Sequence, residues 1–504
     1  MLTPAAIGIL LASVVASAAG SDVLHFETTP NGFNAPPRGW NSFGLQALSP
    51  PLNFEQESVI SQCDALADNL GKYGYEYCSL DSGWSIGDHG DENGRIDYDS
   101  SKFDIPALAN HLHGKKLKLG VYILPGYFSK DKDKQIYGTN PPVKLSDVGT
   151  GECDGLARCA FDYTKPAAQK YCNSVVDQFA SWGVDFIKLD FITPGSPDNN
   201  AGLPADSSGS VICYHKAIAQ NGRKMRLDIS WKLERNDTYY SIWKNNLLKF
   251  ENSADSMRVD QDINNSNQPT LTSWKTVQRT IEQYRQYISL QVPKGQPLTI
   301  YPDMDNLFVG NKASLTGLSD GQRQTVMTHW IGAAANLILG SDMTKLDSLG
   351  LSLLTNTRAQ DVAKFTASYP MRPLEGNNNN MKGSPKQIWI AGPDPTTGVA
   401  VIVLANYGAS GDNSLFDPAP AGGKQELKFA LKDFGLSQDS YCVKDTWNPK
   451  NDRNVTCTET ISVSLDDGES RLWKVVPQTG RNAGGNTTNT WSRTGSIKPT
   501  ASPL

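Results

Sequence analysis

The stretch Gly183-Val184-Asp185-Phe186-Ile187-Lys188-Leu189-Asp190 is a short apolar segment that ends in a lysine and an aspartate two residues apart. Its length and apolar content predict a buried strand. Side chains alternate between the faces of a strand, so we expect Lys188 and Asp190 to point the same way. An ammonium group beside a carboxylate keeps the carboxylate ionised, which suits a nucleophile, although a structural ion pair has the same pattern.

Seven further strand-like segments accompany this one, and longer stretches with a helical pattern lie between them. In chain order the eight predicted strands are 38–43, 75–81, 118–124, 184–190, 225–230, 256–262, 297–303 and 336–342. Predicted helices include 53–73 and 165–182, and the second opens with Lys-Pro, a common helix start. Eight strand–helix alternations predict a (β/α)8 TIM barrel over residues 33–376. A doubly wound open sheet is the alternative.

After residue 376 the pattern changes to short strands separated by turns. Residues 377–380 are four consecutive asparagines and are interpreted as a hinge. The short strands that follow predict a C-terminal antiparallel β-sandwich domain over residues 384–477. Residues 478–504 are rich in Thr, Ser, Asn and Gly, a composition that predicts a disordered tail.

The chain begins with the pattern of an export signal. An apolar run over residues 7–15 precedes Ala16-Ser17-Ala18, so residues 1–18 are predicted to be a signal peptide, and the run is too short to span a bilayer. The eight cysteines agree with a secreted, disulfide-bonded protein. N-glycosylation sequons, which indicate a glycoprotein, occur at Asn236, Asn264, Asn454 and Asn486. Proximity in sequence predicts disulfides Cys153–Cys159 and Cys442–Cys457, whereas the other four cysteines cannot be paired.

The charge pattern narrows the class of partner. The formal net charge is −5 and basic residues are not clustered, which argues against nucleic acid or an anionic membrane as partner and fits a neutral substrate. No clustered His/Cys pattern suggests zinc, and we expect no metal and no cofactor. The oligomeric state is not indicated.

Several predicted strands end in aspartate. In a barrel the carboxyl ends of the strands form one rim, which carries the chemistry. The aspartates at this rim are Asp81, Asp190, Asp262, Asp303 and Asp342. Asp342 is predicted to be a helix N-cap instead of a site residue. Trp40 and Trp84 lie near the same rim, where an aromatic ring either belongs to the core or stacks against the apolar face of a sugar.

A second charge pair accompanies the rim. Arg258 and Asp262 are four residues apart on the predicted sixth strand, hence on one face, where the arginine could bind sugar hydroxyls or hold carboxylates ionised. Carboxylates without His or Cys, beside aromatic rings in an exported chain, suggest glycoside hydrolysis by one nucleophilic carboxylate and one acid. A Mg²⁺ or Ca²⁺ site is the rival use of clustered aspartates, but Lys188 and Arg258 would repel a cation.

Several ordered motifs resemble glycoside hydrolase family 27, the family of α-galactosidases and α-N-acetylgalactosaminidases. Residues 37–43 resemble its opening Gly-Trp-Asn-Ser-Trp segment, and residues 75–84 and 117–122 resemble its second and third strands. Lys188-Leu189-Asp190 matches Lys-x-Asp, and Arg258 with Asp262 matches an Arg followed four residues later by the acid. Further matches are Tyr301-Pro302-Asp303-Met304, Gly310-Asn311 and residues 322–342, and the C-terminal sandwich is the family's companion domain.

The resemblance implies roles for single residues. It implies that Asp190 is the nucleophile and Asp262 the general acid/base. The residues that it implies in sugar binding or in lining the pocket are Trp40, Asp81, Tyr122, Lys188, Arg258 and Asp303. Asp260 also lies an even number of residues from Arg258, so the strand register permits either Asp260 or Asp262, and the resemblance selects Asp262.

Three departures from the family pattern concern the sugar. Ser82 stands where α-galactosidases have the second of two adjacent aspartates. Ser230-Trp231, the remaining candidate substrate-binding residues, stands where galactose-specific members have the Glu-Trp that reads the 2-hydroxyl, with Glu234 four residues on. A serine there resembles N-acetylgalactosaminidases. The family usually has a cysteine soon after the nucleophile, and this chain has Phe191-Ile192-Thr193 there instead.

The resemblance therefore implies a secreted, exo-acting, retaining glycosidase, with α-galactosidase as the leading activity. The alternative within the family is a relative that acts on α-N-acetylgalactosaminides, α-1,6-glucans or β-L-arabinopyranosides. The alternative from another class is a non-catalytic carbohydrate-binding protein, against which the presence of both Asp190 and Asp262 argues.

Overall fold

The computed structural model describes residues 23–233, 253–292, 295–374, 386–409 and 422–478. The predicted signal peptide, the asparagine hinge, residues 479–504 of the predicted tail, Glu234 and the sequons at Asn236 and Asn486 lie outside the described residues. Within the described ranges, no helix combines the length and the apolar character needed to cross a membrane.

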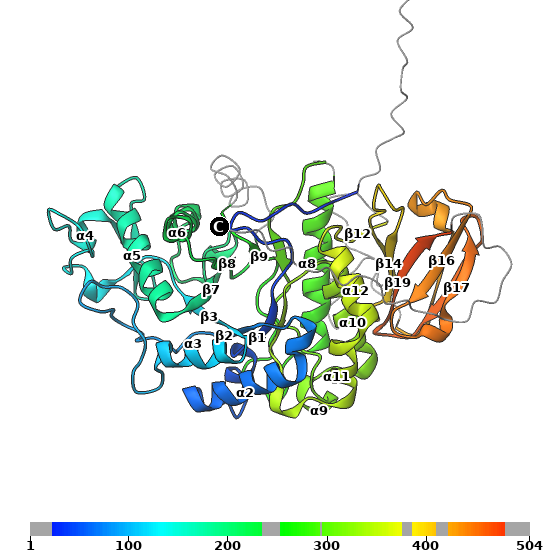
Figure 1. The fold of residues 1–504 in the computed structure, drawn as a ribbon, viewed down its shortest axis with the longest axis horizontal. Helices are drawn as coiled ribbons and strands as arrows, with labels where there is room; N and C mark the ends of the chain where they lie inside the picture. The colour runs from blue at the N-terminus through cyan, green and yellow to red at the C-terminus, as the bar shows by residue number, and fades with distance from the viewer. Residues whose placement is uncertain (1–22, 234–252, 293–294, 375–385, 410–421, 479–504) are drawn as a thin grey trace, which may run out of the picture.

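Eight parallel strands form one curled sheet at the centre of the larger part of the molecule (Figure 1). They are β1 (Arg38–Asn41), β2 (Tyr77–Leu80), β3 (Lys118–Ile123), β7 (Val184–Leu189), β8 (Arg226–Ile229), β9 (Ser256–Arg258), β10 (Tyr301–Asp303) and β11 (Leu337–Leu339). All eight predicted strands are confirmed, and each is shorter than predicted.

The order of these strands is cyclic. It runs β10-β9-β8-β7-β3-β2-β1-β11, so β11 pairs with β1 and the chain order never reverses within the sheet. A doubly wound sheet reverses its strand order at a switch point, so that alternative is wrong. At the two ends of the order, the Asn336 N–H donates to the Pro302 carbonyl at 3.2 Å. The sheet is therefore consistent with a TIM barrel.

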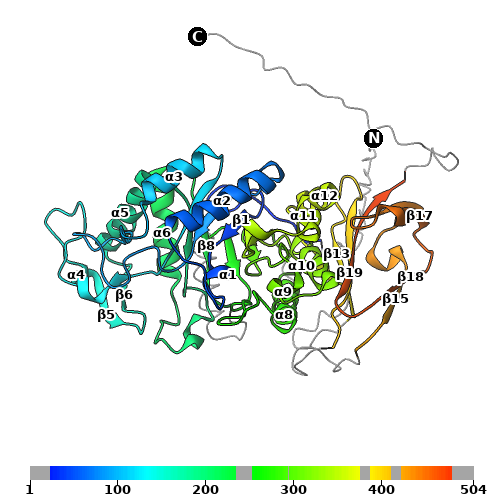
Figure 2. The same cartoon turned by 90° about the horizontal axis from the view of Figure 1, so that it is seen from below.

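Helices cover the outer face of the sheet (Figures 1 and 2). The longer ones are α2 (Gln56–Leu70), α3 (Ile105–Gly114), α5 (Pro166–Trp182), α6 (Ser208–Asn221), α8 (Trp274–Gln291), α10 (Asp320–Gly332), α11 (Ser348–Thr355) and α12 (Thr357–Thr366). The shorter ones are α1 (Phe43–Gln46), α4 (Leu145–Val148) and α9 (Ala313–Thr316). The two helices named above from sequence are confirmed as α2 and α5, and α5 begins at Pro166.

A small lobe is inserted between β3 and α5. It consists of β4 (Tyr127–Phe128), β5 (Gly149–Cys153) and β6 (Arg158–Phe161), in the antiparallel order β4-β6-β5, together with α4. The lobe lies at the end of the molecule away from the C-terminal sheets (Figure 2). Sequence reading did not predict it, because its strands are short and lack alternation.

Two antiparallel sheets form the C-terminal part. The larger contains, in order, β12 (Arg372–Pro373), β13 (Lys386–Ala391), β14 (Ala400–Asn406), β19 (Glu469–Pro477), β16 (Ser440–Asp445) and β17 (Arg453–Thr456). The smaller pairs β15 (Gln425–Phe429) with β18 (Ile461–Leu465). One hydrophobic cluster draws on both, for example Phe429 and Trp473. The larger sheet packs on α10, where Trp447 Nε1 donates to Thr328 Oγ1 at 2.8 Å.

Three disulfides are formed: Cys63–Cys78, Cys153–Cys159 and Cys172–Cys213. The predicted pair 153–159 is confirmed, and the predicted pair 442–457 is wrong, since both of these are free thiols in the described part of the chain. The hairpin register explains the error. Cys442 lies opposite Asn454, whereas the N–H of Cys457 donates to the carbonyl of Asp439, so the two thiols are offset by three positions.

His329 on α10 is buried at the interface between the barrel and the C-terminal sheets. It is fully buried against Trp389, at 4.9 Å between ring centroids, and its Nδ1 lies 3.1 Å from the Tyr407 hydroxyl. Burial lowers the pKa of His329 to about 3. Because the unfolded state keeps the ordinary pKa of about 6.5, protons favour unfolding as the pH falls below that value.

We predict that this buried imidazole costs roughly 2 kcal/mol of folding free energy between pH 7.5 and pH 5. The measurement is urea unfolding of the wild type and His329→Gln at both pH values. Comparing the two pH differences cancels the destabilisation caused by the substitution itself. The free energy of unfolding should fall with acid by roughly 2 kcal/mol less in the variant. An equal fall in both proteins would contradict the prediction.

Candidate active site

The predicted site residues converge on the end of the sheet formed by the carboxyl ends of its strands. Asp81 and Asp190 each follow a strand, β2 or β7, by one residue, and Asp303 is the last residue of β10. Asp262 lies four residues beyond β9. Parallel strands end on the same side, so all four carboxylates belong to one rim.

Lys188 is the cation at the centre of this rim. Its Nζ lies 2.8 Å from Asp81 Oδ2, and 5.5 and 5.9 Å from the ring centroids of Tyr122 and Phe43. Burial alone would lower the pKa of Lys188, but the negative charges of Asp81 and Asp190 outweigh burial and raise it. Lys188 is therefore charged, and its direct partner is Asp81 instead of Asp190.

Asp190 is buried, with 7% of its surface exposed. The backbone N–H of Phe191 donates to Asp190 Oδ1 at 2.9 Å. Burial, then the charges of Asp190 and Asp81, and also a hydrogen bond to Asp190 raise the pKa of Tyr122 well above its usual value, so Tyr122 stays protonated and can donate. The Phe191 N–H orients the Asp190 carboxylate, as a nucleophile requires, and the protonated Tyr122 lies near it.

Asp262 has a different environment. Its Oδ1 lies 2.9 Å from Arg258 Nη2, and its side chain is 36% exposed. Burial raises the pKa of Asp262 to about 6; Arg258 opposes this rise, and the negative charges of Asp305 and Asp190 add to it. A carboxyl group with such a pKa is a proton donor at mildly acidic pH.

Arg258 and Asp262 do form a pair, but strand alternation, the predicted reason for it, is wrong. Strand β9 ends at Arg258, so the alternation of a strand does not relate the two residues. The loop after β9 instead brings Asp262 back over the guanidinium. Asp260 is 2% exposed, and its Oδ2 pairs with Arg279 Nε of α8 at 2.7 Å. This pairing directs Asp260 to the helix layer and favours Asp262 as the acid.

Three other predicted residues occupy different surroundings. Trp40 has no exposed surface and donates from Nε1 to the Ser341 carbonyl at 2.9 Å, so its indole is tied to the segment that follows β11. Asp303 is 8% exposed, and burial, then the negative charge of Asp228, raise its pKa well above the usual range. Ser230 follows β8, and its buried hydroxyl has no partner among the described residues.

Trp231 and Asp342 complete the predicted set. Trp231 is partly buried, and its ring lies 6.0 Å from that of Phe191, measured between centroids. Asp342 caps the 3₁₀ helix Met343–Lys345 by accepting from the Thr344 N–H at 3.1 Å. The prediction that Asp342 is an N-cap is therefore confirmed.

Sequence reading missed two carboxylates in the floor of the site. Asp305 Oδ2 lies 3.2 Å from Arg258 Nη2, and Asp228 on β8 accepts from Ser256 Oγ and, at 3.3 Å, from Asn336 Nδ2. Together with Lys188, Arg258 and Asp303 they line a cavity of about 30 Å³ beneath the rim. The available signal was spacing: Asp305 and Asp228 each lie two residues from a predicted site residue.

The geometry combines an oriented carboxylate, Asp190, and a carboxylic acid of raised pKa, Asp262, with the buried Arg258 and the partly buried Lys188. This arrangement suits displacement at a carbon whose leaving oxygen is protonated. Within the described ranges, no three His, Cys, Asp or Glu side chains are grouped so that they could hold a metal ion.

The chain is similar in sequence to known alpha-galactosidases. A family model described as "Alpha galactosidase A" matches residues 50–129 and 143–364. Alpha-galactosidase 3 of Hypocrea jecorina is 44% identical over 466 residues, which cover 90% of this chain and 72% of that protein. Putative alpha-galactosidase 8 of Emericella nidulans is 39% identical over 418 residues, 80% of each chain.

The fold is also found among solved structures. A GH27-β-L-arabinopyranosidase from Geobacillus stearothermophilus has a TM-score of 0.70 at 21% identity, and the match covers 89% of this chain and 98% of that one. At this identity the likeness concerns the fold alone.

Proposed function

Because this chain belongs to the alpha-galactosidase family of glycoside hydrolases, we propose that it is an exo-acting enzyme that releases terminal α-linked galactose with retention of configuration. The observation that carries this proposal is the contrast between two carboxyl groups at one rim. Asp190 accepts a hydrogen bond from the Phe191 backbone N–H and lies near the protonated Tyr122, while Asp262 has its pKa raised to about 6. Such a contrast assigns the nucleophile and the acid.

The mechanism is a double displacement. Asp190 attacks the anomeric carbon, forming a covalent glycosyl ester, while Asp262 gives its proton to the departing glycosidic oxygen. In the second half, Asp262 as carboxylate removes a proton from water, and the resulting hydroxide displaces Asp190 from the anomeric carbon. Two inversions restore the original configuration, and Asp262 regains its proton.

The sugar would be held by charged groups around these two carboxylates. The Lys188–Asp81 pair presents a donor and an acceptor, and Arg258 adds a second cation. Tyr122 is partly exposed, and its aromatic ring lies beside Lys188. Hydroxyl groups of a neutral sugar pair well with such charged partners, because charge-assisted hydrogen bonds are stronger than neutral ones.

A second candidate is a relative with altered sugar specificity. Ser82 and Ser230 stand where the galactose-reading acids of the family were expected, and the Ser230 hydroxyl has no partner in the described part of the chain. A smaller or differently substituted sugar, such as a β-L-arabinopyranoside or an α-N-acetylgalactosaminide, would use this change.

The test is a panel of nitrophenyl glycosides with purified protein: α-galactoside, α-N-acetylgalactosaminide, α-glucoside and β-L-arabinopyranoside. We expect the highest kcat/KM on the α-galactoside, with the α-anomer released first when the reaction is followed by NMR. Preference for another glycoside would support the second candidate. Initial release of the β-anomer would contradict retention, and no hydrolysis of any glycoside would contradict the proposal as a whole.

We also propose that the enzyme is exported, and that residues 33–376 form a closed catalytic barrel with a β-sandwich over residues 384–477. Support for export comes from the N-terminal sequence pattern and from the three disulfides. Support for the two domains comes from the cyclic strand order and from the hydrophobic cluster shared by the two C-terminal sheets.

A further inference from the structure

A cavity of about 500 Å³ lies at the end of the sheet opposite the catalytic rim. Its lining includes the first residues of four strands: Arg38 of β1, Tyr77 of β2, Lys118 of β3 and Arg226 of β8. Parallel strands begin on the same side, so these residues belong to the amino-terminal face of the sheet. Among the described residues, none lines both this cavity and the one beneath the rim. The volume falls within the range of about 300–1,000 Å³ typical of small-molecule sites.

The lining of this cavity is basic. Four of its five charged side chains are cations, and the acid is Glu76. Glu76 neutralises Lys118, whose Nζ lies 2.6 Å from Glu76 Oε1. Within the described part of the chain, Arg38, Lys224 and Arg226 form no ion pair, and the two arginines donate to neutral oxygens instead. The cavity therefore carries positive charge that the carboxylates of the described residues do not balance.

Arg226 is the buried part of this charge. It is 4% exposed, and its Nη2 donates to the Ala35 carbonyl at 3.0 Å. Its Nε and Nη1 have no hydrogen-bond partner among the described residues. A buried guanidinium with unmade hydrogen bonds is costly, because it has lost water without gaining a counter-charge. An anion in the cavity would supply that charge, which makes Arg226 typical of a binding residue.

Phe33 brings Arg226 and Lys224 together. The centroid of the Phe33 ring lies 3.8 Å from Arg226 Cζ and 4.6 Å from Lys224 Nζ. The Tyr77 ring flanks the guanidinium as well, with its centroid 5.8 Å from Arg226 Cζ. Two cations therefore lie around one aromatic ring, within reach of a single small ligand.

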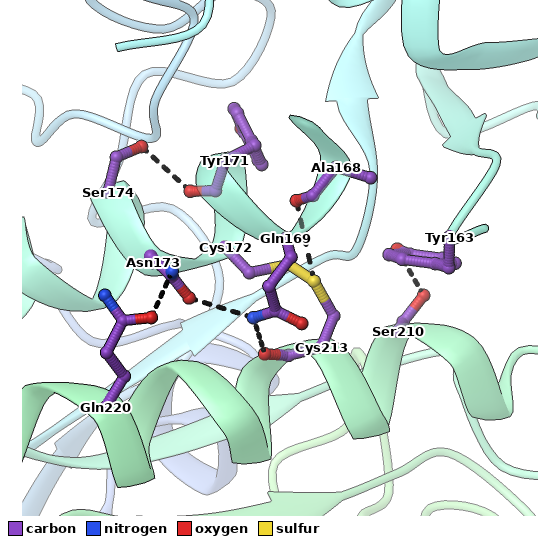
Figure 3. Close-up of a disulfide and its surroundings, with 10 residues drawn as sticks. All are labelled: Tyr163, Ala168, Gln169, Tyr171, Cys172, Asn173, Ser174, Ser210, Cys213 and Gln220. Carbon is purple, nitrogen blue, oxygen red and sulfur yellow. Dashed lines mark hydrogen bonds between the residues drawn. A yellow bond between two sulfur atoms is a disulfide. The ribbon is translucent and has the colours of Figure 1, made fainter. Parts of the chain in front are cut away.

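The segment that carries Lys224 is fixed from two sides. It follows α6, which the Cys172–Cys213 disulfide fastens to α5 (Figure 3). Directly before Lys224, Arg223 Nε donates to the carbonyl of Val184, the first residue of β7, at 3.0 Å. Preformed walls lower the ordering cost of binding.

We propose that this cavity binds a phosphate group, either free or carried by a small organic molecule. A phosphate monoester carries a charge of about −1.5 to −2 at pH 7, which matches the pair of cations Lys224 and Arg226. Arginine and lysine are also the side chains that suit phosphate oxygens. The rest of the cavity leaves room for an organic group beside Phe33, Pro36 and Pro37. This inference goes beyond the proposed function, because the site lies at the end of the sheet away from the reaction.

Calorimetric titration of the purified protein with inorganic phosphate and with glycerol 3-phosphate tests this assignment. At least one of them should bind the wild type, whereas glycerol, which lacks the phosphate group, should not. Lys224→Gln removes one cation from an exposed position in the lining and should weaken binding about tenfold. Lys170→Gln is the matched control, because Lys170 is an exposed lysine on α5 outside the cavity. It should keep the affinity within about twofold of the wild type.

The two ligands distinguish the sources of the phosphate group. Tighter binding of glycerol 3-phosphate would indicate a phosphate monoester, and equal or tighter binding of inorganic phosphate would indicate the free ion. No binding of either to the wild type, equal binding of glycerol, unchanged affinity in Lys224→Gln or an equal loss in Lys170→Gln would overturn the proposal. The readout is binding alone, so a failure of the proposed function would leave this test unaffected.

Discussion

Replacing Asp190 by asparagine should abolish turnover, with kcat lower by about four orders of magnitude or more. The amide has nearly the shape of the carboxylate but cannot form the glycosyl ester. The substitution changes only this side chain and leaves the rest of the pocket intact, because Lys188 keeps its direct partner Asp81. Galactose binding, measured by calorimetry, should therefore remain detectable in the variant.

Asp185→Asn is the matched control for this experiment. Asp185 lies on the same strand, β7, but pairs with Arg223 and His113 on the opposite side of the sheet from the rim. Its loss should lower stability and leave kcat nearly unchanged. Full activity in Asp190→Asn, or equal inactivity in both variants at matched folding, would show that the nucleophile has been assigned wrongly.

The parts of the site that could be predicted from sequence are those fixed by a strand end. Asp81 and Asp190 follow apolar runs, and a parallel sheet places the carboxyl ends of its strands on one side. Local pattern was sufficient to locate them, because the position of a strand end depends on the residues of that strand.

The parts that could not be predicted depend on contacts between distant segments. Asp305, which follows β10, reaches Arg258 on β9, and Asp228 becomes part of the floor only because Ser256 and Asn336 come from other strand segments. The Cys172–Cys213 disulfide likewise joins two helices across a strand. Pattern in one segment carries no information about which remote side chain it meets.

Arg258 stays charged although it is buried in the floor of the site. Its guanidinium is 1% exposed and lies between Asp262 and Asp305. Burial alone would lower the pKa of Arg258, but Asp305 and Asp262 raise it, so Arg258 remains charged. Arg258 is always charged, so it opposes the rise of the Asp262 pKa. It thereby keeps this pKa in the mildly acidic range, at about 6.

Asp262→Asn should therefore change the pH dependence as well as the rate. A general acid acts only when protonated, so kcat/KM of the wild type should fall about tenfold per pH unit above pH 6, where Asp262 loses its proton. The variant cannot donate, so this limb should disappear, and kcat/KM on raffinose at pH 5 should fall by about 10²–10⁴-fold. A dinitrophenyl galactoside, whose leaving group needs no proton, should lose far less.

Asp260→Asn provides the control that separates the two neighbouring aspartates. Asp260 is buried against Arg279, so its loss should lower the free energy of unfolding but preserve the alkaline limb near pH 6. If Asp260→Asn removed the limb and Asp262→Asn kept it, the roles of the two would be exchanged. If both variants kept the limb, the proton donor would be neither, because an acid that acts in the rate-limiting step must leave its own titration in kcat/KM.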